Sequence, residues 1–97
     1  METVKYKLSL YIAGQTQKSR KAIANLKKYC GDELKDSYTV EVIDLLEHPQ
    51  LAEGEQIIAV PTLIKKLPAP ARVLIGDLSD KIKVLVGLNL VRDDPGT

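Results

Sequence analysis

The chain is poor in large aromatic residues and in the two residue types, cysteine and histidine, that most often bind transition metals. Its 97 residues include no phenylalanine or tryptophan, one cysteine and one histidine. The single thiol, Cys30, cannot cycle an intramolecular disulfide, and it gives no disulfide framework. His48 has no cluster of other ligand types near it in sequence, which argues against a metal site. The sequence also lacks a phosphate-binding glycine loop, so we expect no cofactor.

The chain likewise lacks a strong net charge and long hydrophobic runs. Its formal net charge is +1, which points to neither nucleic acid nor a membrane surface as a partner. No apolar run approaches the roughly 20 residues that span a bilayer. The N-terminus carries no apolar segment after its charges, as a signal peptide would. We therefore expect a cytoplasmic protein.

What the chain does contain is enough apolar surface for one domain. Hydrophobic residues make up 44% of the sequence, so we expect a single domain over 1–97. Order is expected over about 4–91, with a disordered tail at 92–97. Basic residues gather in 15–35 and acidic residues in 41–55. This uneven charge suits a protein partner, although solvated helix and strand faces explain it equally well.

The first half of the chain predicts a parallel β-α-β unit. Residues 5–12 alternate in polarity as a strand does, and Thr16 is placed to cap a following helix. That helix carries an apolar stripe of Ile23, Leu26, Cys30 and Leu34. Residues 38–43 form the second strand. On the stripe, Cys30 reads as a buried small hydrophobe, and a reactive thiol is the alternative.

The second half predicts one more helix, a hairpin and a closing helix. A second, weaker helix begins at His48-Pro49 and carries Leu51, Ala52, Ile57 and Ile58. Strands at 62–67 and 72–75 pair antiparallel across a proline-rich link. Asp77 or Ser79 caps the last helix. The resulting order, β-α-β-α-β-β-α, is an α/β fold of the thioredoxin-like type.

The position where thioredoxin-like enzymes hold their dithiol contains no sulfur here. Val60-Pro61-Thr62 matches the step at which such domains place a cis proline beside two cysteines. The stretch at the start of the first helix, 14–19, offers hydroxyls and amides only. Thr16 or Ser19 would need a base to act as a nucleophile, and His48 lies in a different loop. We expect no catalytic residue and a scaffold that binds instead.

Taken together, several segments resemble the KaiB family of clock proteins, and the resemblance runs from about Leu8 to Leu90. The matching segments are Leu10-Tyr11-Ile12-Ala13-Gly14-Gln15-Thr16, Val42-Ile43-Asp44-Leu45-Leu46, Pro49-Gln50-Leu51-Ala52-Glu53, Pro61-Thr62-Leu63, Leu67-Pro68, Ile75-Gly76-Asp77-Leu78-Ser79 and Lys83-Val84-Leu85-Val86-Gly87-Leu88. The resemblance implies a non-enzymatic regulator that docks on a KaiC-type ATPase ring. It also implies a KaiA-type protein as a further partner, and competition with a SasA-type kinase.

The resemblance further implies two alternative folds. One is a homotetramer with a rearranged C-terminal half, and the other is a thioredoxin-like monomer that binds KaiC. The positions it assigns to the exchange, including the cis-proline candidates, are Pro61, Pro68, Pro70, Gly87 and Asn89. From the residues alone, the prolines either support two slowly exchanging packings or only shape a loop and strand edges.

Two departures from the family pattern bear on the choice between the two folds and on partner binding. Asn89-Leu90-Val91-Arg92 stands where the family often has Asp-Leu-Leu-Tyr, and from this we predict the thioredoxin-like monomer over the tetramer. Family positions that are commonly basic hold Glu41, Gln56 and Val73. The partner-binding candidates that stay basic are Lys21, Lys65 and Arg72.

Three alternatives to ring docking stay open. The first is a one-thiol redox protein that uses Cys30. The second is a stress or signalling adaptor of the same fold with another partner. The third is a tetrameric assembly protein.

Overall fold

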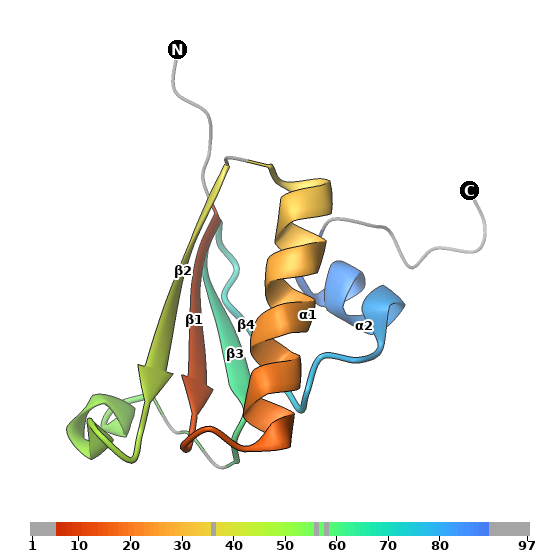
Figure 1. Ribbon diagram of the computed structural model, residues 1–97. Helices are drawn as coiled ribbons and strands as arrows, with labels where there is room; N and C mark the ends of the chain where they lie inside the picture. The colour runs from red at the N-terminus through yellow and green to blue at the C-terminus, as the bar shows by residue number, and fades with distance from the viewer. Residues whose placement is uncertain (1–5, 36, 56, 58, 90–97) are drawn as a thin grey trace.

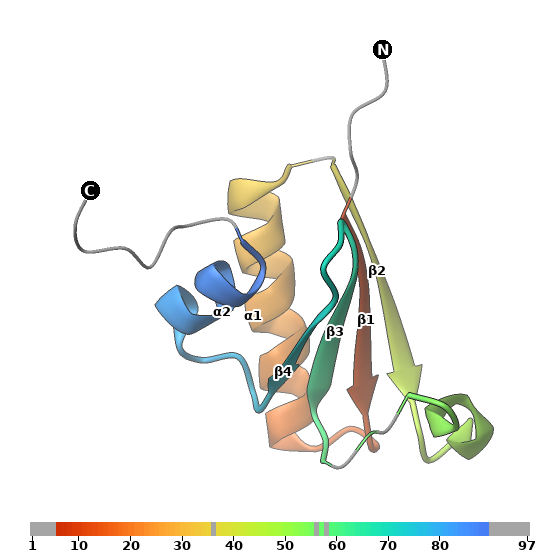
Figure 2. The ribbon, with the colours of Figure 1, turned by 180° about the vertical axis from the view of Figure 1, so that it is seen from behind.

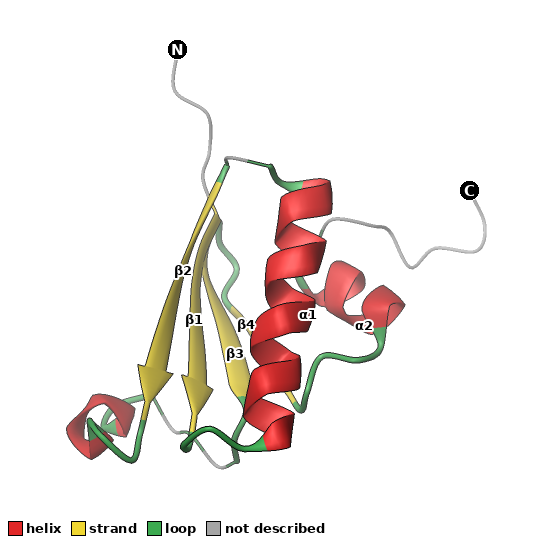
Figure 3. Cartoon of the chain, viewed as in Figure 1, coloured by secondary structure: helices red, strands yellow, loops and turns green. Residues whose placement is uncertain are grey.

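The structure is a computed structural model that describes residues 6–35, 37–55, 57 and 59–89. Its described part forms one four-stranded sheet, in the order β2-β1-β3-β4, with both α-helices on the same face (Figures 1 and 2). In chain order the elements are β1 (Tyr6–Ile12), α1 (Gln17–Glu33), β2 (Tyr38–Asp44), the short 3-10 helix η1 (Pro49–Ala52), β3 (Thr62–Leu67), β4 (Arg72–Ile75) and α2 (Lys81–Gly87) (Figure 3). No helix in this described part is long and apolar enough to cross a membrane.

The N-terminal β-α-β unit is confirmed. β1 and β2 are parallel, and Tyr6 pairs with Tyr38 at one end and Ile12 with Asp44 at the other. Thr16 caps α1, because its side-chain oxygen accepts a hydrogen bond from the backbone N–H of Ser19 at 3.1 Å. Because β1 and β2 are parallel, the chain must cross over between them, and α1 makes this connection while it packs on one face of the sheet.

The predicted hairpin is also confirmed, with the bounds read from the sequence. β3 runs antiparallel to both β1 and β4, so β3 is internal and β4 forms one edge of the sheet. Pro61 precedes β3 and Gly76 follows β4, and the backbone N–H of Gly76 donates to the carbonyl of Pro61 at 2.9 Å. This bond closes the pair at the open end of the hairpin.

The main core lies between the sheet and the two helices. It consists of buried side chains from β1, β3 and both helices, among them Leu8, Leu10, Ile12, Leu26, Cys30, Leu63, Val84, Leu85 and Leu88. These are the inward positions of alternating strands and the apolar stripe of α1. The arrangement is the thioredoxin-like layering that the element order predicts.

The opposite face of the sheet is covered by a loop rather than by a helix. Tyr11, Ile43 and Ile64 are buried there, beneath the partly buried side chains of Leu45 and Ile57. The covering loop is joined to the sheet by an ion pair between Lys66 Nζ and Glu55 Oε1 at 3.1 Å. A half-exposed pair of this kind contributes little to stability, so the buried side chains are the main attachment.

The predicted second helix is wrong in type and length. Only Pro49–Ala52 is helical, as one turn of 3-10 helix, and Ile57 lies beyond it in the loop. Gly54 has a φ of +81°, a conformation that ends a right-handed helix. The predicted member Ile58 lies outside the described residues.

The last helix begins later than predicted, and its predicted caps are wrong. Asp80 caps α2 by accepting from the N–H of Lys83 at 3.2 Å. Asp77 instead accepts from the N–H of Ser79 at 3.0 Å, and Leu78 between them has a φ of +63°. The segment 77–79 is thus a turn that leads into α2.

We expect Gly87→Ala to destabilise the fold by about 1–2 kcal/mol through overpacking. A Cβ at this position would lie 2.6 Å from Cδ2 and 3.2 Å from Cγ of Leu74, closer than van der Waals contact allows. Gly31→Ala is the matched control, because a Cβ there meets nothing within 4 Å. The control should stabilise α1 by about 0.5–1 kcal/mol, since alanine is the better helix former. Urea unfolding measures both changes, and an equal shift for the two variants would contradict this packing.

Candidate docking site

The position that corresponds to a thioredoxin dithiol is a mainly apolar cavity, and none of its lining residues carries sulfur. It has a volume of about 450 Å³ and lies between the start of α1 and the residues before β3. Its lining residues are Ala13, Thr16, Gln17, Lys18, Ser19, Val60 and Pro61. The Val60–Pro61 peptide bond is cis. This end of the molecule therefore places a cis proline beside the start of α1.

The two hydroxyls of this cavity serve the helix cap. Thr16 Oγ1 donates to Ser19 Oγ at 2.9 Å while it accepts from the Ser19 backbone N–H. Ser19 is buried, and His48 is an exposed residue of the loop after β2. No base is recorded within hydrogen-bond distance of either hydroxyl among the described residues, and activation of a nucleophile needs one.

Cys30 lies in the main core, far along α1 from this cavity. It is fully buried, and burial raises the pKa of its thiol to about 11. Because the thiolate is the reactive form, this environment makes the sulfur inert at neutral pH. The one thiol of the chain is therefore a packing residue.

The three basic candidates divide into two places. Lys65 and Arg72 pair across β3 and β4 at one end of the hairpin. Lys21 lies on α1, near the other end of β4, where its charge acts on Asp77. The side-chain amide of Asn25 donates to the backbone carbonyl of Asp77 at 2.9 Å, which holds this end of β4 against α1.

Lys65 differs from the other two candidates in its exposure. Lys21 and Arg72 are exposed, whereas Lys65 is only 1% exposed. Burial, and then the charge of Arg72, lower the pKa of Lys65. Its Nζ lies 5.9 Å from the ring centroid of Tyr6, within the range of a cation–π contact. In this structure the charges of Lys21 and Arg72 therefore lie at the surface, and the charge of Lys65 does not.

The residues assigned to exchange between folds lie around the hairpin and α2. The Leu67–Pro68 and Ala69–Pro70 bonds of the β3–β4 link are cis, like the bond before Pro61. Gly87 ends α2 against Leu74, and Asn89 follows with a φ of +64°. The remaining departures from the family ending, 90–92, lie outside the described residues, as does the tail predicted for 92–97.

Of the changed family positions, Glu41 and Val73 are exposed. Glu41 is on β2, one edge of the sheet, and Val73 is on β4, the opposite edge. Gln56 lies outside the described residues. The two exposed changes therefore lie at opposite edges of the sheet, on the face that the helices do not cover.

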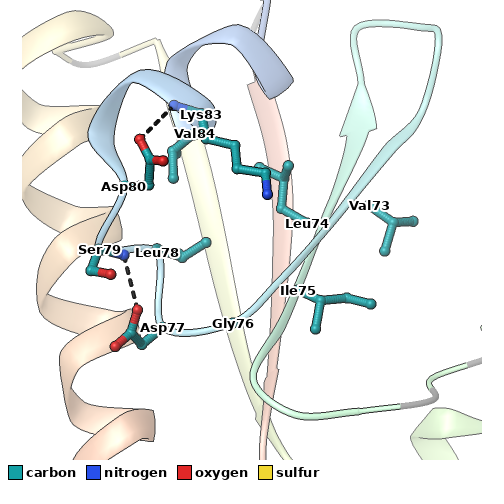
Figure 4. Close-up of a pocket in the computed structure, with 10 residues that line it drawn as sticks. All are labelled: Val73, Leu74, Ile75, Gly76, Asp77, Leu78, Ser79, Asp80, Lys83 and Val84. Atoms are coloured by element: carbon teal, nitrogen blue, oxygen red, sulfur yellow. Dashed lines mark hydrogen bonds between the residues drawn. The ribbon is translucent and has the colours of Figure 1, made fainter.

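A groove that sequence reasoning missed runs between β4 and the start of α2. It has a volume of about 410 Å³ and is lined by Val73–Gly76 on one side and by Asp80, Lys83 and Val84 on the other (Figure 4). The signal for it was the apolar run of Val73, Leu74 and Ile75. That run indicates a strand, but only the sheet order shows that the strand is an edge.

The sequence is similar to known proteins over most of its length. The KaiB domain family matches residues 9–90. A circadian clock oscillator protein KaiB of Rippkaea orientalis is 52% identical over 89 residues, which covers 92% of this chain and 86% of that protein. A KaiB of Prochlorococcus marinus is also 52% identical over 89 residues, covering 92% and 83% of the two chains.

The solved structures that match share the fold. The N-terminal domain of Synechococcus elongatus SasA superposes with a TM-score of 0.73 at 22% identity, covering 97% of this chain and 92% of that one. Mitochondrial thioredoxin 3 of Saccharomyces cerevisiae gives a TM-score of 0.71 at 14% identity, covering 92% and 81%. The thioredoxin-like layering, the empty dithiol position and the extended match in sequence agree, and the chain belongs to the KaiB family of circadian clock proteins.

Proposed function

We propose that this protein is a non-enzymatic clock regulator that docks, as a thioredoxin-like monomer, on a KaiC-type ATPase ring. The observation that carries the proposal is membership of the KaiB family over residues 9–90, at 52% identity to a curated clock protein. A KaiA-type protein is a further partner, and a SasA-type kinase competes for the ring. The likeness to the SasA domain supports only a shared architecture for such competition.

The chemistry of the candidate sites supports binding rather than catalysis. The cavity at the start of α1 holds hydroxyls that are engaged in capping, and Cys30 is buried with a raised pKa. No group of three or more His, Cys, Asp or Glu side chains in the described part is arranged to hold a metal ion. The surface that remains for function is a set of exposed charges and strand edges.

Lys21 and Arg72 are the charges that we assign to the docking surface. Both are exposed and both lie on the helix side of the sheet, since Arg72 is two residues from the inward Leu74 and therefore shares its face of β4. Exposed charges at the rim of an interface act mainly on the association rate. An acidic surface on the ring is the complement that this pair fits.

We expect Lys21→Glu and Arg72→Glu each to slow association with the ring about tenfold at low salt, and less at high salt, because the salt screens exposed charges. The measurement is surface-immobilised binding kinetics with a KaiC-type ATPase from the same organism, in ATP and in ADP. Lys7→Glu is the matched control, because Lys7 is exposed and lies on the opposite face of the sheet, beside Ser9 and Tyr11.

Two results would count against this account, the first against ring docking itself and the second against the assignment of Lys21 and Arg72 to the docking surface. One is the absence of a complex in either nucleotide while the chain remains folded and monomeric by light scattering. That result would favour an adaptor with another partner, which the exposed changes at Glu41 and Val73 make the second candidate. The other is an equal effect of Lys7→Glu, which would show that only net charge matters.

A further inference from the structure

Among the described residues, β4 is an edge strand of the sheet, and its outer side carries backbone groups that do not face β3. It pairs with β3 alone, and Leu63 lies opposite Leu74 and Ile64 opposite Val73. The backbone bond from Gly76 to Pro61 marks one hydrogen-bonded pair of this antiparallel ladder. Such pairs alternate along the strands. The N–H and C=O groups of Val73 and Ile75 therefore point away from β3.

These groups are not taken up elsewhere in the described part of the chain. Outside the strand pairings, no backbone hydrogen bond of residues 6–35, 37–55, 57 and 59–89 involves Val73 or Ile75. Their side chains are 59% and 55% exposed. A strand with open polar groups and exposed β-branched side chains is a template for pairing with another strand.

The outer side of β4 is also a bounded groove rather than a flat edge. α2 forms its second wall, and the turn 76–80 closes one end. Figure 4 shows Lys83 reaching from α2 toward Leu74, whereas Val73 and Ile75 point away from the helix. The volume of about 410 Å³ is suited to a few residues of extended chain. A groove between a strand edge and a helix is a recurring way to bind peptides.

We propose that the groove between β4 and α2 binds an extended peptide segment of a partner protein, which adds to the sheet as a strand antiparallel to β4. The inference does not rest on ring docking, because it concerns the outer edge of β4 and is tested with isolated peptides. The outward groups of Val73 and Ile75 would each form a two-bond pair with the peptide.

The charges at the ends of the groove select the sequence and direction of that segment. Arg72 begins β4, and Asp77 and Asp80 stand beyond its other end. Hydrogen bonds from Ser79, and then the charges of Lys21 and Lys18, lower the pKa of Asp77, so its carboxylate is ionised at neutral pH. An antiparallel segment therefore carries a basic residue first and an acidic residue last. Its apolar second and fourth residues lie beside Ile75 and Val73.

A second copy of this chain fits the groove less well than a bare strand does. Pairing two β4 edges about a two-fold axis would bring α2 of each copy to the same side of the joined sheet. α2 already borders the groove through Lys83 and Val84. The incoming strand therefore cannot carry a helix of its own at that place.

The probe is the capped peptide acetyl-Lys-Val-Leu-Ile-Glu-amide, titrated into the full chain and followed by backbone NMR. We expect saturable shifts at Val73 and Ile75, and slower hydrogen exchange of their N–H groups as they become bonded. A peptide with its two charged ends exchanged should bind at least about fivefold more weakly, because each end would then meet a like charge.

Methylation of single peptide nitrogens gives the sharpest control, since it leaves the protein unchanged. Methylation at the second or fourth residue removes a donor to Ile75 or Val73 and should weaken binding at least about tenfold. Methylation at the third residue, whose N–H faces away from β4, should have a much smaller effect. The protein variant Val73→Pro should weaken binding similarly, and it removes no bond of the β3–β4 ladder.

Equal affinity for all the methylated peptides would overturn the proposal, as would shifts that map to β2 rather than β4. Dimerisation of the chain that the peptide does not displace would overturn it in favour of a second copy. Ring docking is measured separately, so loss of peptide binding with docking intact would count against this groove alone.

Discussion

Alkylation of Cys30 should be at least about 100-fold slower in the folded protein than in the unfolded chain at pH 8. The pKa of the thiol rises from 9.0 to about 11 on burial, and at pH 8 that rise lowers the thiolate fraction about 100-fold. The side chain is also fully buried, so the reagent reaches it only when the core opens. Iodoacetamide labelling followed by mass spectrometry, with and without urea, measures the ratio.

The same shift makes stability depend on pH in one direction. Because the folded pKa is the higher one, the folded state retains the proton above pH 9, where the unfolded chain releases it. The contribution of the protonated Cys30 thiol to the free energy of unfolding is complete below pH 9, and it is lost as the pH rises through about 11. Burial raises the pKa of Tyr6 and lowers that of Lys65, so other groups titrate in the same region.

Comparison with Cys30→Ala isolates the thiol from those groups. The difference in unfolding free energy between the protein and this variant should shrink from pH 9 to pH 11, while the tyrosine and lysine contributions cancel. Rapid labelling of the folded chain at neutral pH would contradict this account. It would support the one-thiol redox protein that the sequence alone leaves open.

The hairpin could be predicted from the sequence because its signals are local. β3 begins directly after Pro61, and β4 ends directly before Gly76. The α1 cap at Thr16 is equally local, since its side chain accepts from the N–H of Ser19, three residues later. Local chemistry was thus enough to place five of the elements along the chain and to give the thioredoxin-like order.

The start of α2 could not be predicted, because three residues compete for its cap. Asp77, Ser79 and Asp80 are all good capping residues within one turn. The choice is made by a distant contact, in which Asn25 of α1 holds the carbonyl of Asp77. That contact fixes 77–79 as a turn and leaves Asp80 as the cap.

The burial of Lys65 and the groove beside β4 depend on the sheet order, which no local pattern specifies. Lysine is rarely buried, so its place in the sequence read as a surface charge. It is buried because β3 is an internal strand with a helix layer over one face. Val73 and Ile75 are exposed for the converse reason, since β4 has a neighbour on one side only.

Asp44→Ala should lower the free energy of unfolding by about 2–3 kcal/mol, because it removes a charged acceptor from two backbone donors. One carboxylate oxygen, Oδ1, accepts from the N–H of Gly14 at 2.9 Å and from the N–H of Leu46 at 3.0 Å. Asp44 thereby joins the turn after β1 to the loop that covers the open face of the sheet. Gly14 has a φ of +75°, a conformation that glycine adopts readily. The hydrogen bond to Asp44 holds the turn in this conformation.

Two further variants separate the acceptor from the charge. Asp44→Asn keeps an oxygen at the same place and should cost about half as much, since neutral hydrogen bonds are weaker than charged ones. Asp32→Ala removes the same charge from an exposed position on α1 and should change stability by less than about 0.5 kcal/mol. Chemical unfolding measures all three. Equal losses of unfolding free energy for Asp44→Ala and Asp32→Ala would mean that Asp44 acts only through net charge. A larger loss for Asp44→Ala than for Asp44→Asn would show that the covering loop is held to the sheet by this one oxygen as well as by Leu45 and Ile57.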